Sequence, residues 1–143
     1  MRELAQRFVR GEVPPPPVAT TIGFKPTLIE EGRAVFVMEA DPARHGNPMG
    51  TIHGGILCDL ADAAMGMAWA SRLEEGETFT TLELKINFFK PVWKQTLKAE
   101  AKIVKAGRTV GMVECDLFDG SGALVARASS TCLTLRGEAA KGR

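Results

Sequence analysis

Residues 54–73 read GGILCDLADAAMGMAWASRL, and this stretch decides the fold. It is rich in Ala, Leu and Met and contains no proline, and it is long enough for about five helical turns. It is the only long helix that the sequence predicts. Because apolar residues occur nearly all round it, the rest of the chain has to cover its faces.

The segments on either side of this helix are predicted to be strands. They are enriched in β-branched and aromatic residues and are bounded by turn-forming clusters such as EEG at 30–32 and DGSG at 119–122. The predicted strands are 18–24, 33–40, 78–89, 97–106, 110–118 and 124–135. An antiparallel sheet curling around one central helix is the simplest way to bury that helix, which predicts an α+β fold.

The two ends of the chain are predicted to lie outside this core. Residues 2–10 show helical spacing of apolar side chains, and four prolines follow at 14–17. We therefore expect a short leading helix with a proline linker over 1–17 and a flexible tail over 136–143. With 143 residues, of which 45% are apolar, the chain is expected to form one domain, 1–143.

Composition restricts the partners and the compartment. The 18 Lys and Arg residues almost balance the 17 Asp and Glu residues, so no overall field attracts nucleic acid or an anionic membrane. We expect no targeting segment, and no run of about 18 apolar residues occurs in the sequence. The cysteines Cys58, Cys115 and Cys132 are odd in number and widely spaced, which indicates free thiols in a reducing, cytoplasmic compartment.

A polar loop enters the long helix through two glycines. The loop at 41–50, DPARHGNPMG, is crowded with residues that break helices and strands, so we expect it to be irregular. Unpaired N–H groups at a helix N-terminus favour developing negative charge, such as the oxyanion of a thioester under attack. Asp62 lies about two turns into the helix among Leu and Ala, where a carboxylate is costly unless it is functional or paired. Asp59 shares that helical side, and the residues alone do not separate the two.

Each candidate also has a structural interpretation. Asp62 can be a hydrogen-bonded buried carboxylate or a group at a subunit interface. His53 can cap the helix, and Asn47 can stabilise a turn. Thr81 can be an ordinary strand residue. His45 and His53 lack a metal-binding spacing, so no metal site is expected. No serine elbow, dinucleotide fingerprint or P-loop occurs.

The run N-x-x-G-x-x-H-G-G, with an acidic residue nine positions after the histidine, resembles the hotdog-fold acyl-CoA thioesterases called PaaI-like, the phenylacetate-degradation type. TLELKINFFKP at 81–91 and KAGRT at 105–109 resemble later segments of that family. The likeness extends over 18–135. It implies a hotdog fold, a sheet wrapped around one long helix with a short N-terminal helix, and an enzyme that hydrolyses acyl- or aryl-CoA to free acid and coenzyme A.

The resemblance also implies roles for individual residues. Asp62, rather than Asp59, would be the nucleophile or general base, and Gly54 would supply the oxyanion N–H. His53 would orient the thioester, and Asn47 would hold the attacking water or the carbonyl. Thr81, from the strand of a neighbouring subunit, would assist the water.

The coenzyme A part of the substrate carries phosphates that the neutral chain has to meet locally. Gly55, Lys90, Lys105 and Arg108 are the candidates for these contacts, with Arg108 placed near the mouth of the site by its turn. No cofactor is expected, because coenzyme A is itself part of the substrate.

The resemblance further implies a homodimer that assembles into a homotetramer, with sites formed between subunits. Leu57, Ala61 and Met65 are expected to form an apolar acyl pocket against the partner. Two alternatives are a non-catalytic acyl-CoA binding or regulatory module and a hotdog dehydratase, although the dehydratase loop pattern is not found here.

Overall fold

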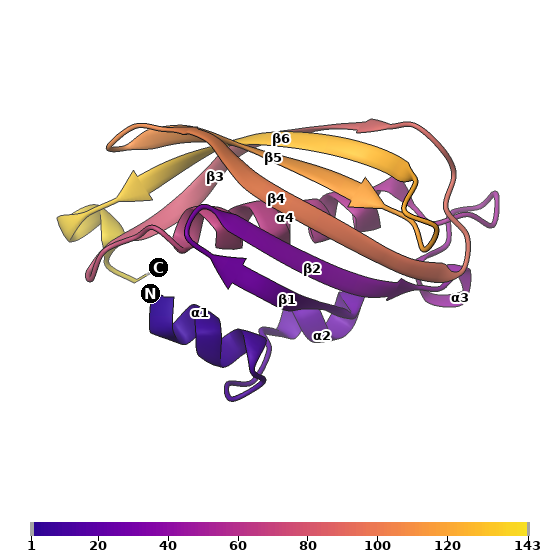
Figure 1. Cartoon of the computed structure of the whole chain (residues 1–143), viewed down its shortest axis with the longest axis horizontal. Helices are drawn as coiled ribbons and strands as arrows, with labels where there is room; N and C mark the ends of the chain where they lie inside the picture. Colours follow the sequence, from indigo (N-terminus) through magenta and orange to yellow (C-terminus); the bar gives the residue numbers. More distant parts are fainter. Residues whose placement is uncertain (1, 143) are drawn as a thin grey trace.

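The computed structural model describes residues 2–142, which form a six-stranded antiparallel sheet packed on one long helix, α4. Across the sheet the strands follow the order β1-β2-β4-β5-β6-β3. The strands are β1 (Phe24–Glu30), β2 (Arg33–Ala40), β3 (Thr78–Phe88), β4 (Gln95–Ala106), β5 (Val110–Phe118) and β6 (Leu124–Leu135). Figure 1 shows the sheet sweeping across one side of α4. The predicted α+β architecture is confirmed.

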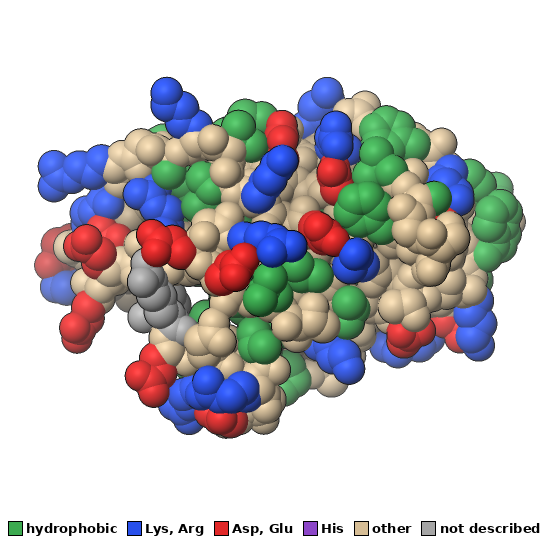
Figure 2. Space-filling view, viewed as in Figure 1, with side chains coloured by type: hydrophobic (Ala, Val, Ile, Leu, Met, Phe, Trp, Pro, Cys, Tyr) green, Lys and Arg blue, Asp and Glu red, His purple; other side chains and the backbone are tan. Residues whose placement is uncertain are grey.

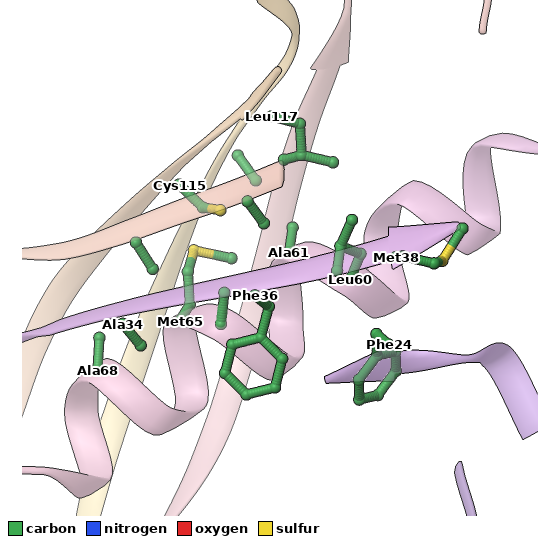
Figure 3. Close-up of a cluster of buried hydrophobic side chains, with 14 of the residues drawn as sticks. Phe24, Ala34, Phe36, Met38, Leu60, Ala61, Met65, Ala68, Cys115 and Leu117 are labelled. Atoms are coloured by element: carbon green, nitrogen blue, oxygen red, sulfur yellow. The ribbon is translucent and has the colours of Figure 1, made fainter. Parts of the chain in front are cut away.

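The long helix α4 spans Gly54–Ala70, three residues fewer than predicted. One of its faces forms the core with the sheet. Its buried residues are Leu57, Leu60, Ala61, Ala64, Met65, Gly66, Ala68, Trp69 and Ala70. Figure 3 shows part of this core, in which side chains of α4 lie beside Phe36 of β2 and Leu117 of β5. Burying each large side chain contributes about 1.5–3 kcal/mol, so this face fixes the helix on the sheet.

The opposite face of α4 is not covered by the sheet. Asp59 and Asp62 are exposed on it, and Ile56, Ala63 and Met67 are only partly buried. The sheet curves around one side only, and both candidate carboxylates lie on the side that it leaves open.

Strand β3 forms an edge of the sheet. It pairs with β6, and its other edge has no strand partner among residues 2–142. The register of the pair shifts between Thr81 and Glu83, which places Leu82 in a bulge with 55% of its surface exposed. A free edge strand is a template for pairing with another chain.

The N-terminal region differs from expectation. The leading helix is confirmed as α1 (Arg2–Val9), but the predicted strand 18–24 is instead the helix α2 (Pro17–Ile22). Pro17 occupies the start of α2, where its fixed φ suits a helix, and Gly23 ends α2 with a φ of 93°. The first strand begins only after this glycine.

Two further segments contain short helices. Within the loop predicted to be irregular, Pro42–His45 form the one-turn helix α3, whose N-cap is Asp41. Within the predicted tail, Gly137–Ala140 form the 3₁₀ helix η1; the flexibility of the tail stays a prediction. None of the helices in the described part of the chain is long and apolar enough to cross a membrane. On the face shown in Figure 2, acidic and basic side chains are interspersed.

Candidate active site

The N-terminal end of α4 presents a backbone N–H group without an acceptor. Nδ1 of His53 accepts a hydrogen bond from the N–H of Gly55 (2.9 Å), and the His53 carbonyl accepts one from Ile56 (3.0 Å). Among residues 2–142, no atom accepts the N–H of Gly54. This donor lies at the positive end of the helix dipole, so it is suited to a developing oxyanion.

His53 and Gly55 together cap the helix. A Cβ at position 55 would lie 2.9 Å from Nδ1 of His53, so glycine allows the ring to approach the backbone. Because Nδ1 accepts this hydrogen bond, the neutral ring carries its proton on Nε2 and can donate from there. The N–H of Gly55 is thus used in the cap, and a contact of Gly55 with coenzyme A stays a prediction.

Asn47 holds the turn that precedes the helix. Its Oδ1 accepts hydrogen bonds from the N–H groups of Met49 (2.9 Å) and Thr51 (3.1 Å), and its Nδ2 donates to Oγ1 of Thr51 (2.8 Å). The structural interpretation of Asn47 is therefore correct. A direct contact of Asn47 with substrate stays a prediction.

His45 is a residue of this region that the sequence did not single out. Its buried ring accepts the N–H of Asp41 at Nδ1 (3.1 Å), and Nε2 lies 2.9 Å from the carbonyl of Ile22. Its own carbonyl accepts the N–H of His53 (2.8 Å). The neutral ring satisfies both contacts, so His45 ties the loop before Gly54 to the end of α2.

A groove runs beside the start of α4. It has a volume of about 420 Å³, and most of its lining residues are apolar. Its lining residues are Asn47, Ile52, Gly54, Leu57, Phe88, Phe89, Lys90, Pro91 and Val92. Phe88 and Phe89 are 51% and 56% exposed, so the aromatic wall of the groove is open to a ligand.

Halfway along α4, the Oγ1 of Thr81 donates a hydrogen bond to Oδ1 of Asp62 (3.1 Å). The two residues belong to the same chain, so the expectation that Thr81 comes from the subunit opposite Asp62 is corrected. The reason is that β3 runs beside the open face of α4. This contact occupies one carboxylate oxygen of Asp62 and leaves the other free to act on water.

Asp59 lies one turn before Asp62 on the same open face. Partial burial and, second, the charge of Asp62 raise the pKa of the Asp59 carboxyl. Burial therefore disfavours the ionised form of Asp59. Asp62, by contrast, accepts a hydrogen bond from the Thr81 hydroxyl.

The oxyanion donor and the carboxylate are separated in one chain. Asp62 follows Gly54 by eight residues on the same helix, which corresponds to about 12 Å along its axis. Atoms that react on one carbonyl have to lie within about 3–3.5 Å of it. Gly54 and Asp62 of one chain therefore do not act on the same carbonyl.

The expected acyl pocket on α4 is corrected in part. Ala61 and Met65 have no exposed surface and belong to the core under the sheet, where Figure 3 shows them. Only Leu57 reaches the groove. An all-apolar helix gives no periodic signal for which face is covered, which explains the error.

The predicted phosphate contacts are scattered over the chain. Lys90 lines the groove, but its Nζ lies 2.6 Å from Oδ2 of the buried Asp119, so an anion has to compete for it. Lys105 and Arg108 lie in the β4–β5 hairpin, which Arg72 ties to the far end of α4 through a bond to the Gly107 carbonyl. They are about 25 Å from Gly54 along the helix, so Arg108 does not lie at the mouth of the groove of its own chain.

Comparisons with known proteins agree with this fold. The model of the thioesterase superfamily matches residues 49–126. A protein of Saccharolobus solfataricus that is named as an esterase is 36% identical over 110 residues, 76% of each chain. Acyl-coenzyme A thioesterase 13 of Mus musculus is 29% identical over 110 residues, 75% of this chain and 78% of that protein.

A solved structure is similar over nearly the whole chain. It is a phenylacetic acid degradation-related protein from Ralstonia eutropha JMP134, with 33% identity and a TM-score of 0.82. The similarity covers 90% of this chain and 98% of that one. The chain therefore belongs to the thioesterase superfamily, and it is a thioester hydrolase with the PaaI-like hotdog fold that its sequence resembles.

Proposed function

We propose that the protein hydrolyses acyl-coenzyme A thioesters, with the Asp62 carboxylate driving the attack. The observation that carries this proposal is the hydrogen bond from Thr81 to Asp62 on the one face of α4 that the sheet leaves open. It fixes a carboxylate at an accessible position beside a strand edge. Asp62 either takes a proton from water or attacks the carbonyl itself; both routes need this orientation.

We further propose that Gly54 of a second copy supplies the oxyanion N–H to the site of Asp62. The 12 Å or so between the two residues in one chain calls for a second chain. The open face of α4 and the free edge of β3 offer adjacent surfaces for it. A two-fold dimer of this kind would hold two equivalent sites, and pairing of dimers would give the expected tetramer.

The substrate proposed is an aryl or medium-chain acyl-CoA. The groove next to Gly54 is lined by two exposed aromatic rings, Phe88 and Phe89, which suit a flat or apolar acyl group. The names of the relatives point the same way, since one acts on acyl-coenzyme A and another is related to phenylacetic acid degradation. The three cysteines of the chain are free, which fits a cytoplasmic enzyme.

The nucleotide end of the substrate is proposed to meet Lys105 and Arg108. Both side chains are exposed on the hairpin near the C-terminal end of α4. Asp62 lies about 12 Å from that end, whereas the pantetheine arm spans roughly five peptide units, about 17 Å. A thioester at Asp62 can therefore place its phosphates over the hairpin of the same chain.

The test is free-thiol release from a panel of aryl, short-chain and medium-chain acyl-CoAs. Asp62→Asn is expected to abolish turnover, and the matched variant Asp59→Asn to retain it. If Asp59→Asn loses turnover and Asp62→Asn keeps it, the assignment of Asp62 is wrong. If the wild type binds the panel without releasing thiol, the chain is a non-catalytic acyl-CoA binding module instead.

A further inference from the structure

The free N–H group of Gly54 follows directly on a short paired loop. Residues 45–47 run antiparallel to residues 51–53, and the N–H of His53 donates to the carbonyl of His45 (2.8 Å). The second of these two legs ends at His53, the residue immediately before Gly54. The direction of the Gly54 N–H therefore depends on how this loop is fixed to the rest of the chain.

The contacts that shape the loop differ from those that anchor it. The side chain of Asn47 bonds only to Met49 and Thr51 among the described residues, so it closes the loop without tying it to another element. The second leg has an outside anchor, because the N–H of Ile52 donates to the carbonyl of Val92 (2.8 Å). The first leg needs an anchor of its own.

The imidazole ring of His45 anchors the first leg. Its Nδ1 accepts the N–H of Asp41 (3.1 Å), so the neutral ring carries its proton on Nε2. Nε2 lies 2.9 Å from the carbonyl of Ile22, the last residue of α2, and donates to it. The ring is only 4% exposed, and a buried group that loses such a partner is left unsatisfied. Both ring nitrogens are thus used, which fixes the ring in one orientation.

The other side-chain contacts around α3 are exposed to solvent. Nζ of Lys94 lies 3.1 Å from Oδ2 of Asp41, and Nη2 of Arg44 donates to the carbonyl of Thr21 (2.8 Å). Water competes for contacts of this kind, so they hold a segment weakly. A single helical turn such as α3 is also unstable by itself. The buried ring of His45 is therefore the contact that holds this turn in place.

We propose that His45 is a positioning residue of the active site, whose ring, held between Asp41 and Ile22, fixes the loop that directs the N–H of Gly54. The inference rests on the proposed role of Gly54 as the oxyanion donor. Such a donor has to lie about 2.7–3.1 Å from the oxyanion, so a small displacement of the loop weakens it. His45 does not touch substrate, and it acts only through the start of α4.

Arg44 provides a matched control. It is the neighbour of His45 in α3, and its side chain also donates to a carbonyl of α2, that of Thr21. Arg44→Gln removes this exposed contact and leaves the buried ring in place. A difference in kcat between variants of the two residues therefore reports the ring of His45 and not a general loosening of α3 from α2.

The experiment measures kcat, KM and thermal unfolding with the best acyl-CoA of the panel, at a temperature where every variant is folded. His45→Met fills similar space without hydrogen bonds and is expected to lower kcat about tenfold with KM unchanged. His45→Gln has a similar length and carries a donor that can reach the Ile22 carbonyl, so it should recover most of kcat. Arg44→Gln should keep the kcat of the wild type.

A double variant tests whether His45 acts through Gly54. Adding His45→Met to Gly54→Pro should cause no further loss of kcat, because the donor that His45 positions is already absent. If His45→Met does not fold, His45→Asn replaces it, since Asn keeps an acceptor for the Asp41 N–H and loses only the bond to Ile22. The same losses of kcat are expected from it.

Two results would overturn this inference. One is a kcat for the His45 variant equal to that of Arg44→Gln, and the other is a pair of losses that multiply in the double variant with Gly54→Pro. An impaired Gly54→Pro with an unimpaired His45 variant overturns only the role of His45. A fully active Gly54→Pro overturns the proposed oxyanion donor itself.

Discussion

The ring of Phe88 lies against Gly54 so closely that a Cβ at position 54 would be 2.8 Å from its Cζ atom. Gly54 begins α4, and Phe88 ends β3 at the edge of the sheet. The helix start that carries the free N–H is therefore covered on one side by an aromatic side chain. Glycine at position 54 allows this close approach without a shift of the ring.

Gly54→Pro removes the N–H group at position 54, and Gly54→Ala controls for the added side-chain volume. Proline is favoured at the first position of a helix, and the ψ of 136° at His53 suits a following proline. We expect kcat to fall by about 10²–10³-fold, because the oxyanion donor is lost. Gly54→Ala crowds Phe88 in the same way but keeps the N–H, so it should lose much less. Equal kcat values for the two variants would contradict the oxyanion role.

Two substitutions of His53 should distinguish the role of Nδ1, which caps the helix, from the role of Nε2, which we expect to orient the thioester. His53→Ala loses the acceptor for the Gly55 N–H and should lower the free energy of unfolding by about 1 kcal/mol. His53→Asn keeps an acceptor, so its stability in urea denaturation should stay near that of the wild type. Both variants lose Nε2 and should have a lower kcat. A fully active His53→Asn would refute the orienting role.

The ion pair of Lys90 with Asp119 should make stability depend on pH. Lys90 and then Ser121 hold the pKa of the Asp119 carboxyl well below its usual range. A depressed folded-state pKa contributes stability that is complete above the unfolded value, about 3.9, and is lost as pH falls toward the folded value. Asp119→Asn should therefore lower Tm at pH 7, and the difference from the wild type should shrink below about pH 4. A difference in Tm that stays constant down to pH 2.5 would contradict this.

Arg108→Gln tests the proposed phosphate contact. We expect KM for acyl-CoA to rise several-fold while kcat changes little, because the guanidinium binds the ground state and the transition state equally. The same acyl group on pantetheine, which lacks the nucleotide, should show no effect. Arg33→Gln, an exposed arginine elsewhere on the surface, is the control. If KM for the pantetheine thioester rises as well, Arg108 does not act through the phosphates of the nucleotide.

Much of the fold could be predicted because strong turn signals bound the elements. The strands 110–118 and 124–135 agree with β5 and β6 at both ends, since glycine-rich turns flank them. The error at 18–24 came from reading β-branched residues as a strand. Pro17 at the start and Gly23 at the end are typical helix boundary residues, and this signal was present in the sequence.

The site was harder to predict because it depends on contacts between distant segments. The motif pointed to Asp62 and Thr81, but their contact within one chain depends on how β3 lies along α4. His45 gave no local signal, because its ring contacts the carbonyl of Ile22, which lies 23 residues earlier in the sequence.

The central claim is that Asp62 of one copy works with Gly54 of another, and mixing two inactive variants tests it most directly. Asp62→Asn and Gly54→Pro are unfolded together, refolded and assayed for thiol release. Each mixed dimer then contains one site with neither substitution, so about a quarter of the wild-type activity should return by random two-fold pairing. Mixed dimers that form, as shown by mass spectrometry, but release no thiol would contradict the account.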